Sequence, residues 1–284
     1  MRVAFLGPAG TFTDEALRAS APGDVEEVEF PTVHETVMAV QRGAAELAVV
    51  PIENSLEGGV AATLDALAGE AESVRIAAEV VHPISHCLVA AEPLELAGVE
   101  RVISHPQATA QCAAFLRERL PAAERLDVGS TAEAVRQVVG AGRPWAALAS
   151  RLAAELYGAE VLAEGVEDRP DNRTRFVWLR SDQAPPPFVE EGPLKTSIVF
   201  WGAGDESPGW LVRVLGELAD REVNMTRIES RPRRVRLGHY MFFCDLEGGE
   251  AEPAVAEALD AVAGHVEGVR VLGSYPGVSG VGDR

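Results

Sequence analysis

"SDQAPPPFVEEGP", residues 181–193, separates two different patterns of secondary structure and thereby decides the fold of this 284-residue chain. Three consecutive prolines favour an extended spacer. A chain of this length exceeds one typical domain. We therefore predict a first domain at 1–180, a proline-rich linker at 181–193 and a second domain at 194–276. Because the spacer would separate two cores, a chain ending near Gln183 should fold by itself.

Upstream of the linker, short apolar runs alternate with helical patterns. "RVAFL" at 2–6 predicts a strand that enters a glycine turn and a helix, and this strand–helix order repeats toward residue 180. Such alternation is typical of a parallel α/β sheet, here wound as two lobes. Two β-branched runs at 74–90 suit a crossover between the lobes near 78–84. The chain would return near 160–172. This is the two-lobed arrangement of periplasmic binding proteins.

Downstream of the linker the order changes to strand, helix, two strands, helix and strand. This β-α-β-β-α-β order predicts a ferredoxin-like split βαβ module. We expect the last residues, 277–284, to be disordered. The six predicted elements are "KTSIVFWG" (195–202), "PGWLVRVLGELADRE" (208–222), "VNMTRIESRP" (223–232), "GHYMFFCDLEG" (238–248), "PAVAEALDAVAG" (253–264) and "VEGVRVLGSYP" (266–276).

The composition narrows the function. Asp and Glu number 44 against 25 Lys and Arg, which gives a net charge of −19. Such a surface repels nucleic acid, so no nucleic-acid partner is expected. A small anion would also be repelled at long range, and it would have to be captured by a local cluster of donors.

Two features of the sequence predict the cellular location: the targeting and membrane-spanning segments that it lacks, and the spacing of its cysteines. The chain shows neither a signal-peptide pattern nor an apolar run long enough to span a membrane, so no membrane partner is expected. Cys87, Cys112 and Cys244 are far apart, as small buried residues of a reducing compartment would be. We therefore expect a cytoplasmic protein.

Polar groups follow three predicted strands. "GPAGTFTDEAL" at 7–17 is a glycine turn before a helix start, where backbone N–H groups can hold an anion. "VVPIENSLEGG" at 49–59 and "ISHPQATAQC" at 103–112 place polar side chains where an α/β fold has its ligand crevice. Each stretch alone is also compatible with no ligand: an ordinary βα turn at 7–17, a polar loop with a helix cap at 49–59, and a helix start with a solvated face at 103–112.

"NRTRF" at 172–176 is the least ordinary stretch. It places Thr174 between two arginines and follows them with Phe176. One interpretation is a charged strand entrance. The other is a pocket for a small anion with an apolar body.

Several chemistries lack their motifs. His82 and His86 stand four apart around Pro83 in a strand-like context, so they lack the helical face of a zinc pair. Walker A, dinucleotide and nucleophile-elbow patterns are missing from the sequence. We expect neither a metal nor a cofactor.

Together these stretches resemble the prephenate dehydratase family. The resemblance rests on "GPAGTFT", "PIENSLEGG", "SHPQATAQC" and "NRTRF" in the first domain, and on "IESRP" and "LGSYP" in the second. The intact N-x-T-R-F motif is the most diagnostic of them. The second domain resembles an ACT regulatory domain. No chorismate mutase helix precedes Met1, so the resemblance implies the monofunctional form.

The resemblance implies a lyase that converts prephenate, a dianion, to phenylpyruvate, water and carbon dioxide in L-phenylalanine biosynthesis. Aromatisation drives this reaction, so a cofactor is unnecessary. Thr174 would donate to the departing hydroxyl, Arg175 would pair with a carboxylate, and Phe176 would form apolar wall. Glu53 near an anion would be protonated or face a hydrogen-bonded neighbour. The implied catalytic residues are Thr174, Asn54, Ser104, Gln111 and Glu53, and the implied substrate-binding residues are Thr11, Ser55, Gln107, Arg175 and Phe176.

The resemblance also implies control by phenylalanine at the ACT domain. ACT modules pair, which implies a homodimer or homotetramer through ACT and catalytic domains. Trp210 stands where the family has a small residue. It would turn outward into a subunit interface or crowd the effector site. The implied effector-binding residues are Gly209, Trp210, Leu211, Asn224, Met225, Glu229 and Ser230.

Two other classes remain open at this point. Two lobes joined by crossover strands also suit a non-catalytic sensor of amino acids or oxoacids. The intact Thr174 argues against a sensor without activity. A purely structural ACT-linked subunit leaves the motifs of the first domain unexplained.

Overall fold

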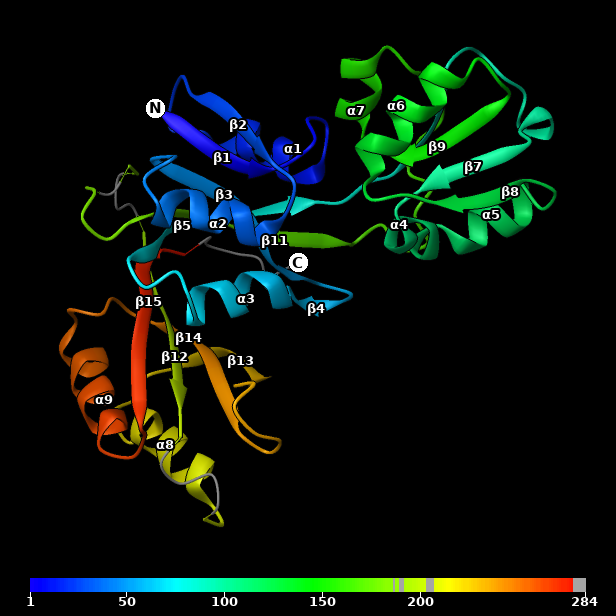
Figure 1. Cartoon of the computed structure of the whole chain (residues 1–284). Helices are drawn as coiled ribbons and strands as arrows, with labels where there is room; N and C mark the ends of the chain where they lie inside the picture. Colours follow the sequence, from blue (N-terminus) through cyan, green and yellow to red (C-terminus); the bar gives the residue numbers. More distant parts are fainter. Residues whose placement is uncertain (186, 189–191, 203–206, 278–284) are drawn as a thin grey trace.

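A computed structural model describes residues 1–185, 187–188, 192–202 and 207–277. The chain forms two α/β lobes and a third α/β unit that lies beside the first lobe (Figure 1). The tail predicted to be disordered lies outside the described residues except for Gly277, as do parts of the predicted linker.

The first lobe is a mixed sheet in the order β2-β1-β3-β11-β5, with β4 paired to β3. Its central strands are buried apolar runs that stack against helices on the sheet faces. Its elements are β1 (Arg2–Leu6), α1 (Phe12–Ser20), β2 (Glu26–Phe30), α2 (Val33–Gln41), β3 (Leu47–Asn54), β4 (Gly58–Gly59), α3 (Ala61–Ala68), β5 (Val74–Pro83) and β11 (Arg173–Ser181).

The second lobe is also a mixed sheet, in the order β10-β6-β9-β7-β8. The chain enters it between β5 and β6 and leaves it between β10 and β11 (Figure 1). Its elements are β6 (Cys87–Ala90), η1 (Leu96–Gly98), β7 (Arg101–Ser104), α4 (Pro106–Gln111), α5 (Ala113–Arg119), β8 (Glu124–Asp127), α6 (Thr131–Ala141), β9 (Trp145–Ala149), α7 (Arg151–Tyr157) and β10 (Glu160–Ala163).

The α/β class and the two lobes agree with the sequence analysis, but the prediction of purely parallel sheets is wrong. The returning strand β11 lies antiparallel to both β3 and β5. In the second lobe, β6 lies antiparallel to both β9 and β10. The antiparallel strands are the ones next to the two crossovers, because a strand that comes back from the other lobe enters the sheet from the opposite end.

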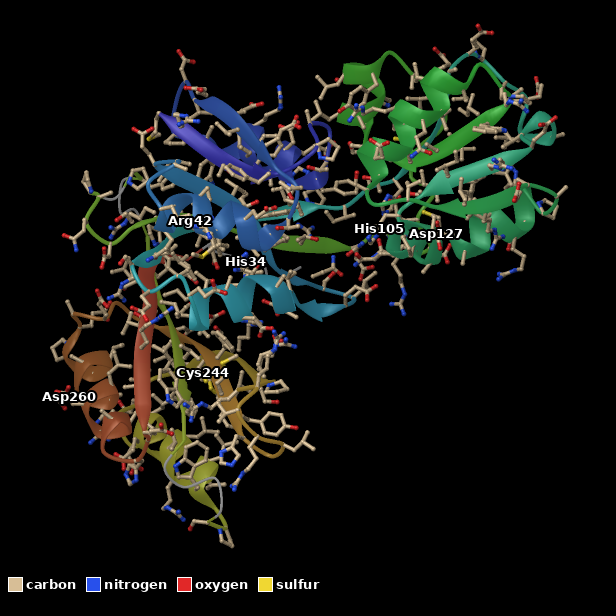
Figure 2. All side chains as sticks on the ribbon, in the orientation of Figure 1. His34, Arg42, His105, Asp127, Cys244 and Asp260 are labelled. Carbon is tan, nitrogen blue, oxygen red and sulfur yellow. The ribbon has the colours of Figure 1, made fainter. Side chains whose placement is uncertain are left out.

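The third unit has the predicted β-α-β-β-α-β order. Its antiparallel sheet runs β13-β14-β12-β15, and its two helices pack with one face of the sheet. Cys244 lies in this core (Figure 2). The elements are β12 (Leu194–Trp201), α8 (Trp210–Ala219), β13 (Met225–Pro232), β14 (Tyr240–Glu247), α9 (Pro253–Ala263) and β15 (Gly268–Pro276).

The other face of this sheet packs on the first lobe. Val199, Phe243, Leu272 and Tyr275 share one hydrophobic cluster with residues of the first lobe such as Ile76. Figure 1 shows the upper end of β15 reaching β5. The expectation that the linker separates two cores is therefore wrong, because the largest apolar cluster contains side chains from both sides of it. Removing the third unit would expose this cluster to water.

Ion pairs cross the same interface. The Lys195 Nζ atom lies 2.7 Å from Glu79 Oε1. The Asp65 carboxylate accepts from Nε and Nη2 of Arg231 at 3.1 and 2.9 Å, and from Arg234 at 2.6 Å. The interface therefore combines a large apolar cluster with ion pairs, and the Glu79 end of one pair is buried.

Two further features concern the cysteines and the helices. Cys87, Cys112 and Cys244 are buried free thiols, which confirms their interpretation as small core residues. Among the helices of the described ranges, none is long and apolar enough to cross a bilayer.

Gly273 should be required for this interface. A Cβ atom there would overlap the backbone carbonyl oxygen of Ile76 on β5, so Gly273→Ala should push β15 away and destabilise the protein by about 1–3 kcal/mol. The matched control is Gly216→Ala inside α8, where a Cβ meets nothing within 4 Å. That control should stabilise by about 0.5–1 kcal/mol. Urea unfolding of both variants measures the difference, and equal midpoints would contradict the packing argument.

Candidate active site

The main cavity of interest lies between the two lobes and has a volume of about 320 Å³. Apolar walls surround a small number of polar groups, as in typical sites for small ligands. Residues of both lobes line it: Leu6, Thr11, Phe12, Thr13, Val33, Pro51, Asn54, Val60, Ile84, His86, His105, Gln107, Ala108, Gln111, Gly129, Ser130, Thr131, Thr174 and Phe176.

Helices begin at this cavity. Thr11 caps α1, and its hydroxyl accepts from the Asp14 N–H at 3.3 Å. Ser130 caps α6 in the same way through the Glu133 N–H at 3.1 Å. His105 marks the start of α4 on the side of the second lobe (Figure 2). Free N–H groups and the helix dipole make such ends attractive to anions.

Positive potential in the cavity comes from the backbone and not from lysine or arginine side chains of the described residues that line it. Its lining residues, which all belong to the described ranges, include neither arginine nor lysine. The starts of α1 and α6, one in each lobe, are therefore groups that favour an anion in the cavity. The turn before α1 was predicted from the sequence to hold an anion, whereas Ser130 and α6 were not.

The pairing of β11 with β3 decides which side chains reach the cavity. Thr174 lies opposite Asn54, and Arg175 lies opposite Glu53. Directly opposite residues share a face of a sheet, and neighbours along a strand alternate. Thr174, Asn54 and Phe176 therefore face the cavity, whereas Arg175 and Glu53 face the third unit.

The Thr174 hydroxyl is held as an acceptor. Asn54 Nδ2 donates to Thr174 Oγ1 at 2.9 Å, and both side chains are buried. Among the described residues this is the bond that the structure gives to the hydroxyl, so its proton is available for a ligand. Thr174 is thus a ready donor at the apolar end of the cavity next to Phe176.

Gln111 and His86 lie across the cavity. Gln111 Oε1 is 3.1 Å from His86 Nε2 and 3.0 Å from Asn172 Nδ2. Burial lowers the pKa of His86, and the amide and nearby carboxylates only partly oppose this effect. Since Gln111 Oε1 can only accept, the neutral imidazole carries its proton on Nε2. Its buried Nδ1 has no partner within the described part of the chain.

The predicted site residues divide into two groups. Thr11, Asn54, Gln107, Gln111, Thr174 and Phe176 line the cavity together. The other four, Glu53, Ser55, Ser104 and Arg175, are not among its lining residues. His86 also lines the cavity and was not predicted, because its sequence context gave no sign beyond a poor metal-ligand spacing.

Ser104 and Ser55 act on the backbone. Ser104 is fully buried, and its hydroxyl donates to the Leu148 carbonyl at 2.8 Å on the neighbouring strand. His105, not Ser104, caps α4. Ser55 Oγ accepts from the Arg173 N–H at 3.0 Å and fixes the start of β11. Their predicted direct roles at the substrate are corrected to supporting roles.

Arg175 forms a buried ion cluster instead of facing the cavity. Its Nη1 lies 2.7 Å from Asp245 Oδ2 and 3.2 Å from Glu79 Oε2, and its Nε lies 3.2 Å from Glu53 Oε2. Burial alone would lower the pKa of Arg175, but the carboxylates, Asp245 first, raise it above its ordinary value. Glu53 also pairs with Arg227 at 3.5 Å. Contrary to the expectation that they line the substrate site, Arg175 and Glu53 therefore point away from the cavity, into the interface with the third unit.

A second cavity, of about 340 Å³, lies at the start of α8. Its lining includes the predicted Gly209, Trp210 and Leu211, together with Tyr240 and Phe242. Gly209 has φ +76°, a conformation that favours glycine.

The other predicted effector residues lie elsewhere in the same chain. Asn224 and Ser230 are exposed on or beside the edge strand β13, which also carries Met225. Glu229 pairs with Arg227 and lies so close to Gly59 of the first lobe that a Cβ there would overlap it. Within one chain, the structure does not bring β13 and the Gly209 cavity together as one site.

Trp210 does not turn outward. It is 6% exposed, packs with Phe200 and Phe242, and donates its indole N–H to the His265 carbonyl at 2.7 Å. The interpretation of Trp210 as an outward interface residue is wrong. Its ring fills the core of the third unit and forms one wall of the second cavity.

Comparisons with known proteins agree with this architecture. The family model described as prephenate dehydratase matches residues 3–184, and the ACT domain model matches 196–264. A prephenate dehydratase of Mycobacterium sp. (strain JLS) is 44% identical over 286 residues, which cover 97% of this chain and 89% of that protein.

Two solved structures are similar over nearly the whole chain. The prephenate dehydratase of Arthrobacter aurescens in complex with L-Phe has a TM-score of 0.88 and 39% identity, covering 98% of this chain and 90% of that one. GqqA, described as a novel type of quorum quenching acylase, has a TM-score of 0.86 and 35% identity, covering 98% and 99%.

Fold and cavity define a two-lobed α/β protein with a small cavity between its lobes, and the chain also carries an ACT domain. Within that class, the family match over residues 3–184 and the relative at 44% identity are decisive. The chain belongs to the prephenate dehydratase family, whose members are carbon–oxygen lyases.

Arg175 should matter for stability more than for substrate affinity. Arg175→Gln leaves Asp245 buried without its closest cation and should cost about 3–5 kcal/mol of unfolding free energy. Adding Asp245→Asn should restore part of that loss, because the uncompensated charge is then removed. Denaturant unfolding of wild type, single and double variants measures this. A single variant that is as stable as wild type would contradict the assigned cluster.

His86 should make stability depend on pH. Because the pKa of His86 is lowered in the folded state, its contribution is fully present above the ordinary value of 6.5 and is lost as pH falls below it toward the folded value. His86→Gln can keep the donor to Gln111 without titrating. The unfolding free energy of wild type minus that of this variant should therefore fall as the pH drops below about 6.5, by at most about 1.4 kcal/mol per pH unit. A constant difference would contradict the buried neutral imidazole.

Proposed function

We propose that this chain converts prephenate to phenylpyruvate, water and carbon dioxide. The observation that carries the proposal is the cavity between the lobes, where the Thr174 hydroxyl has a free proton beside an apolar wall and two helix starts face the same space. Family membership supplies the substrate class, and the cavity has the donors that this substrate requires.

The hydrogen-bond donors that line the cavity come from both lobes, which suits a substrate with two negative charges. Prephenate carries one carboxylate on its ring and a second at the end of the side chain on the same ring carbon. The starts of α1 and α6 offer backbone N–H groups from opposite lobes, so each lobe can hold one end of the charge. Gln107 and Gln111 add neutral donors from α4. Phe176 and Pro51 can pack against the ring.

The chemical step needs help mainly where hydroxide leaves. The bond between the ring and its carboxylate breaks, the electron pair enters the ring, and the carbon–oxygen bond on the opposite side of the ring breaks. The products are phenylpyruvate, carbon dioxide and hydroxide, and the hydroxide takes a proton from solvent to become water. Thr174 donates a hydrogen bond to the departing oxygen, and Asn54 fixes its direction. A preorganised donor of this kind contributes about 10²–10³ in rate.

The cofactor requirement and the cellular compartment are also part of the proposal. The electrons move within the substrate, so the proposed reaction requires no cofactor. We assign the enzyme to the cytoplasm, as the three free cysteines support a reducing compartment.

The proposal includes control by phenylalanine through paired ACT domains. The relative from Arthrobacter aurescens was solved with L-Phe. In this chain the Gly209 cavity is apolar, with Trp210 and Phe242 in its wall. A partner's β13 edge could complete it, which would bring Asn224 and Ser230 to a ligand's charged groups. Homodimers or homotetramers follow, and light scattering that finds only a 30.1 kDa monomer would contradict them.

A second activity deserves a direct assay because GqqA shares the fold and 35% identity. Acyl transfer commonly uses an activated nucleophile with a base beside it. Of the lining hydroxyls, Thr11 and Ser130 are committed to helix caps, and the hydrogen bond given to Thr174 comes from the Asn54 amide and not from a base. We therefore favour the dehydratase. Two assays decide between the activities. One follows release of phenylpyruvate from prephenate by ultraviolet absorbance, and the other follows hydrolysis of an acylated amine.

Thr174→Ala should lower kcat by about 10²–10³ with a much smaller change in KM, because the hydrogen bond strengthens as the hydroxide leaves. Thr174→Ser retains the hydroxyl and should keep most of the activity. Steady-state kinetics on prephenate compare the three proteins. Near wild-type turnover of the alanine variant would remove Thr174 from the mechanism.

Trp210→Phe should change phenylalanine affinity severalfold or more, because it shortens one wall of the Gly209 cavity and removes the bond to His265. Trp201→Phe is the matched control, since Trp201 lines a different cavity near Asp65. Calorimetric titration with phenylalanine measures both. Absence of heat in wild type would defeat the effector proposal, and equal titrations of the two variants would remove Trp210 from the site.

A further inference from the structure

Asn172 lies between β10 and β11, where the chain re-enters the first lobe, and the mechanism above does not use it. It is 1% exposed. Its side chain touches both lobes: Oδ1 lies 2.9 Å from Asn54 Nδ2 on β3, and Nδ2 lies 3.0 Å from Gln111 Oε1 on α4. It therefore links two residues that line the cavity.

Backbone groups determine which way Asn54 points. Asn54 Oδ1 accepts from the N–H groups of Leu56 at 2.9 Å and Glu57 at 3.1 Å. Its NH₂ group must then face the Arg173 carbonyl oxygen, at 3.2 Å, and the Asn172 side chain. A reversed amide would place oxygen against this carbonyl and NH₂ against two N–H groups.

The orientation of the Asn54 amide fixes that of the Asn172 amide, which in turn fixes that of the Gln111 amide. Since Asn54 presents NH₂, Asn172 must present its oxygen to Asn54 and its NH₂ to Gln111. Gln111 Oε1 then accepts from Asn172, and it accepts a second time from His86 Nε2. Both acceptor positions of this oxygen are used. The free end of Gln111 in the cavity is its NH₂ group.

We propose that Asn172 is a positioning residue that makes Gln111 present a donor, not an acceptor, to the bound anion. The proposal rests on the proposed function for the identity of that anion. A donor toward a carboxylate is attractive, whereas a reversed Gln111 would oppose oxygen to oxygen. Asn172 thus acts on substrate affinity without touching the substrate.

Asn172→Asp tests this with almost no change in shape. The aspartate still accepts from Asn54, but it offers a second oxygen to Gln111, which must turn its amide. We expect KM for prephenate to rise about tenfold or more, with kcat changed much less. The control is Asp171→Asn, the reverse exchange at the exposed neighbouring residue, which should leave KM within about twofold. A KM of Asn172→Asp equal to that of wild type would overturn the proposal.

A double-mutant cycle separates positioning from charge. If Asn172 acts through Gln111, adding Asn172→Asp to Gln111→Ala should raise KM no further. A direct repulsion between the new carboxylate and the substrate would instead give the full increase in both backgrounds. Additive effects would therefore overturn the proposal.

A measurement on the wild type requires neither activity nor a stable variant. In nitrogen-15 NMR spectra, the side-chain NH₂ of Asn172 should exchange slowly with water, because it is buried and bonded to Gln111. The NH₂ of Gln111 should exchange faster, because it faces the cavity. The opposite order would overturn the proposal. A wild type inactive on prephenate defeats the proposed function alone, while this exchange order still decides the role of Asn172.

Discussion

The alternation of side chains along β11 is the constraint on which both halves of the protein depend. Thr174 and Phe176 project into the cavity, and Arg175 between them projects into the ACT interface. Their partners on β3 alternate in the same way, because Asn54 faces the cavity and Glu53 faces the ACT interface. A shift of one residue in register would put the guanidinium in the cavity and the hydroxyl in the interface. Strand β11 is held against this by β3 and β5 on its two sides.

This arrangement makes the ACT domain part of the support for the catalytic strand. Burial of Arg175 would be unfavourable without its carboxylates, and one of these, Asp245, is supplied by β14. Asp245 accepts from Ser197 at 2.6 Å, and Ser197 also bonds to Tyr275 at 2.6 Å. The burial of Asp245 raises its pKa, but Arg175 and Ser197 more than offset this and keep the carboxyl ionised. Ser197 of β12, Asp245 of β14 and Tyr275 of β15 thus form a connected group that reaches Arg175, the residue next to Thr174.

Local patterns were sufficient to predict much of the fold and part of the site. Alternating apolar runs revealed both α/β lobes, and the order of elements revealed the ACT module. Strand ends pointed to the stretches that contain Thr11, Asn54, Gln107 and Gln111, because ligands gather at such ends, whereas Thr174 came from the family resemblance of "NRTRF" at the start of a strand. Two features could not be predicted from local patterns. The face that Arg175 and Glu53 take depends on long-range pairing between residues 53 and 175. The role of His86 depends on Gln111 coming close across the cavity.

The helix starts at the cavity have a consequence for how this enzyme can vary. Attraction that comes from peptide N–H groups belongs to the main chain, and every amino acid except proline carries such a group. Caps such as Thr11 and Ser130 can be exchanged for other capping residues while the positive end of each helix stays in place. Affinity for anions is therefore robust to mutation in this pocket, and side-chain variation among relatives would reveal little of it. Ligand preference, by contrast, depends on the few side chains that a mutation can change.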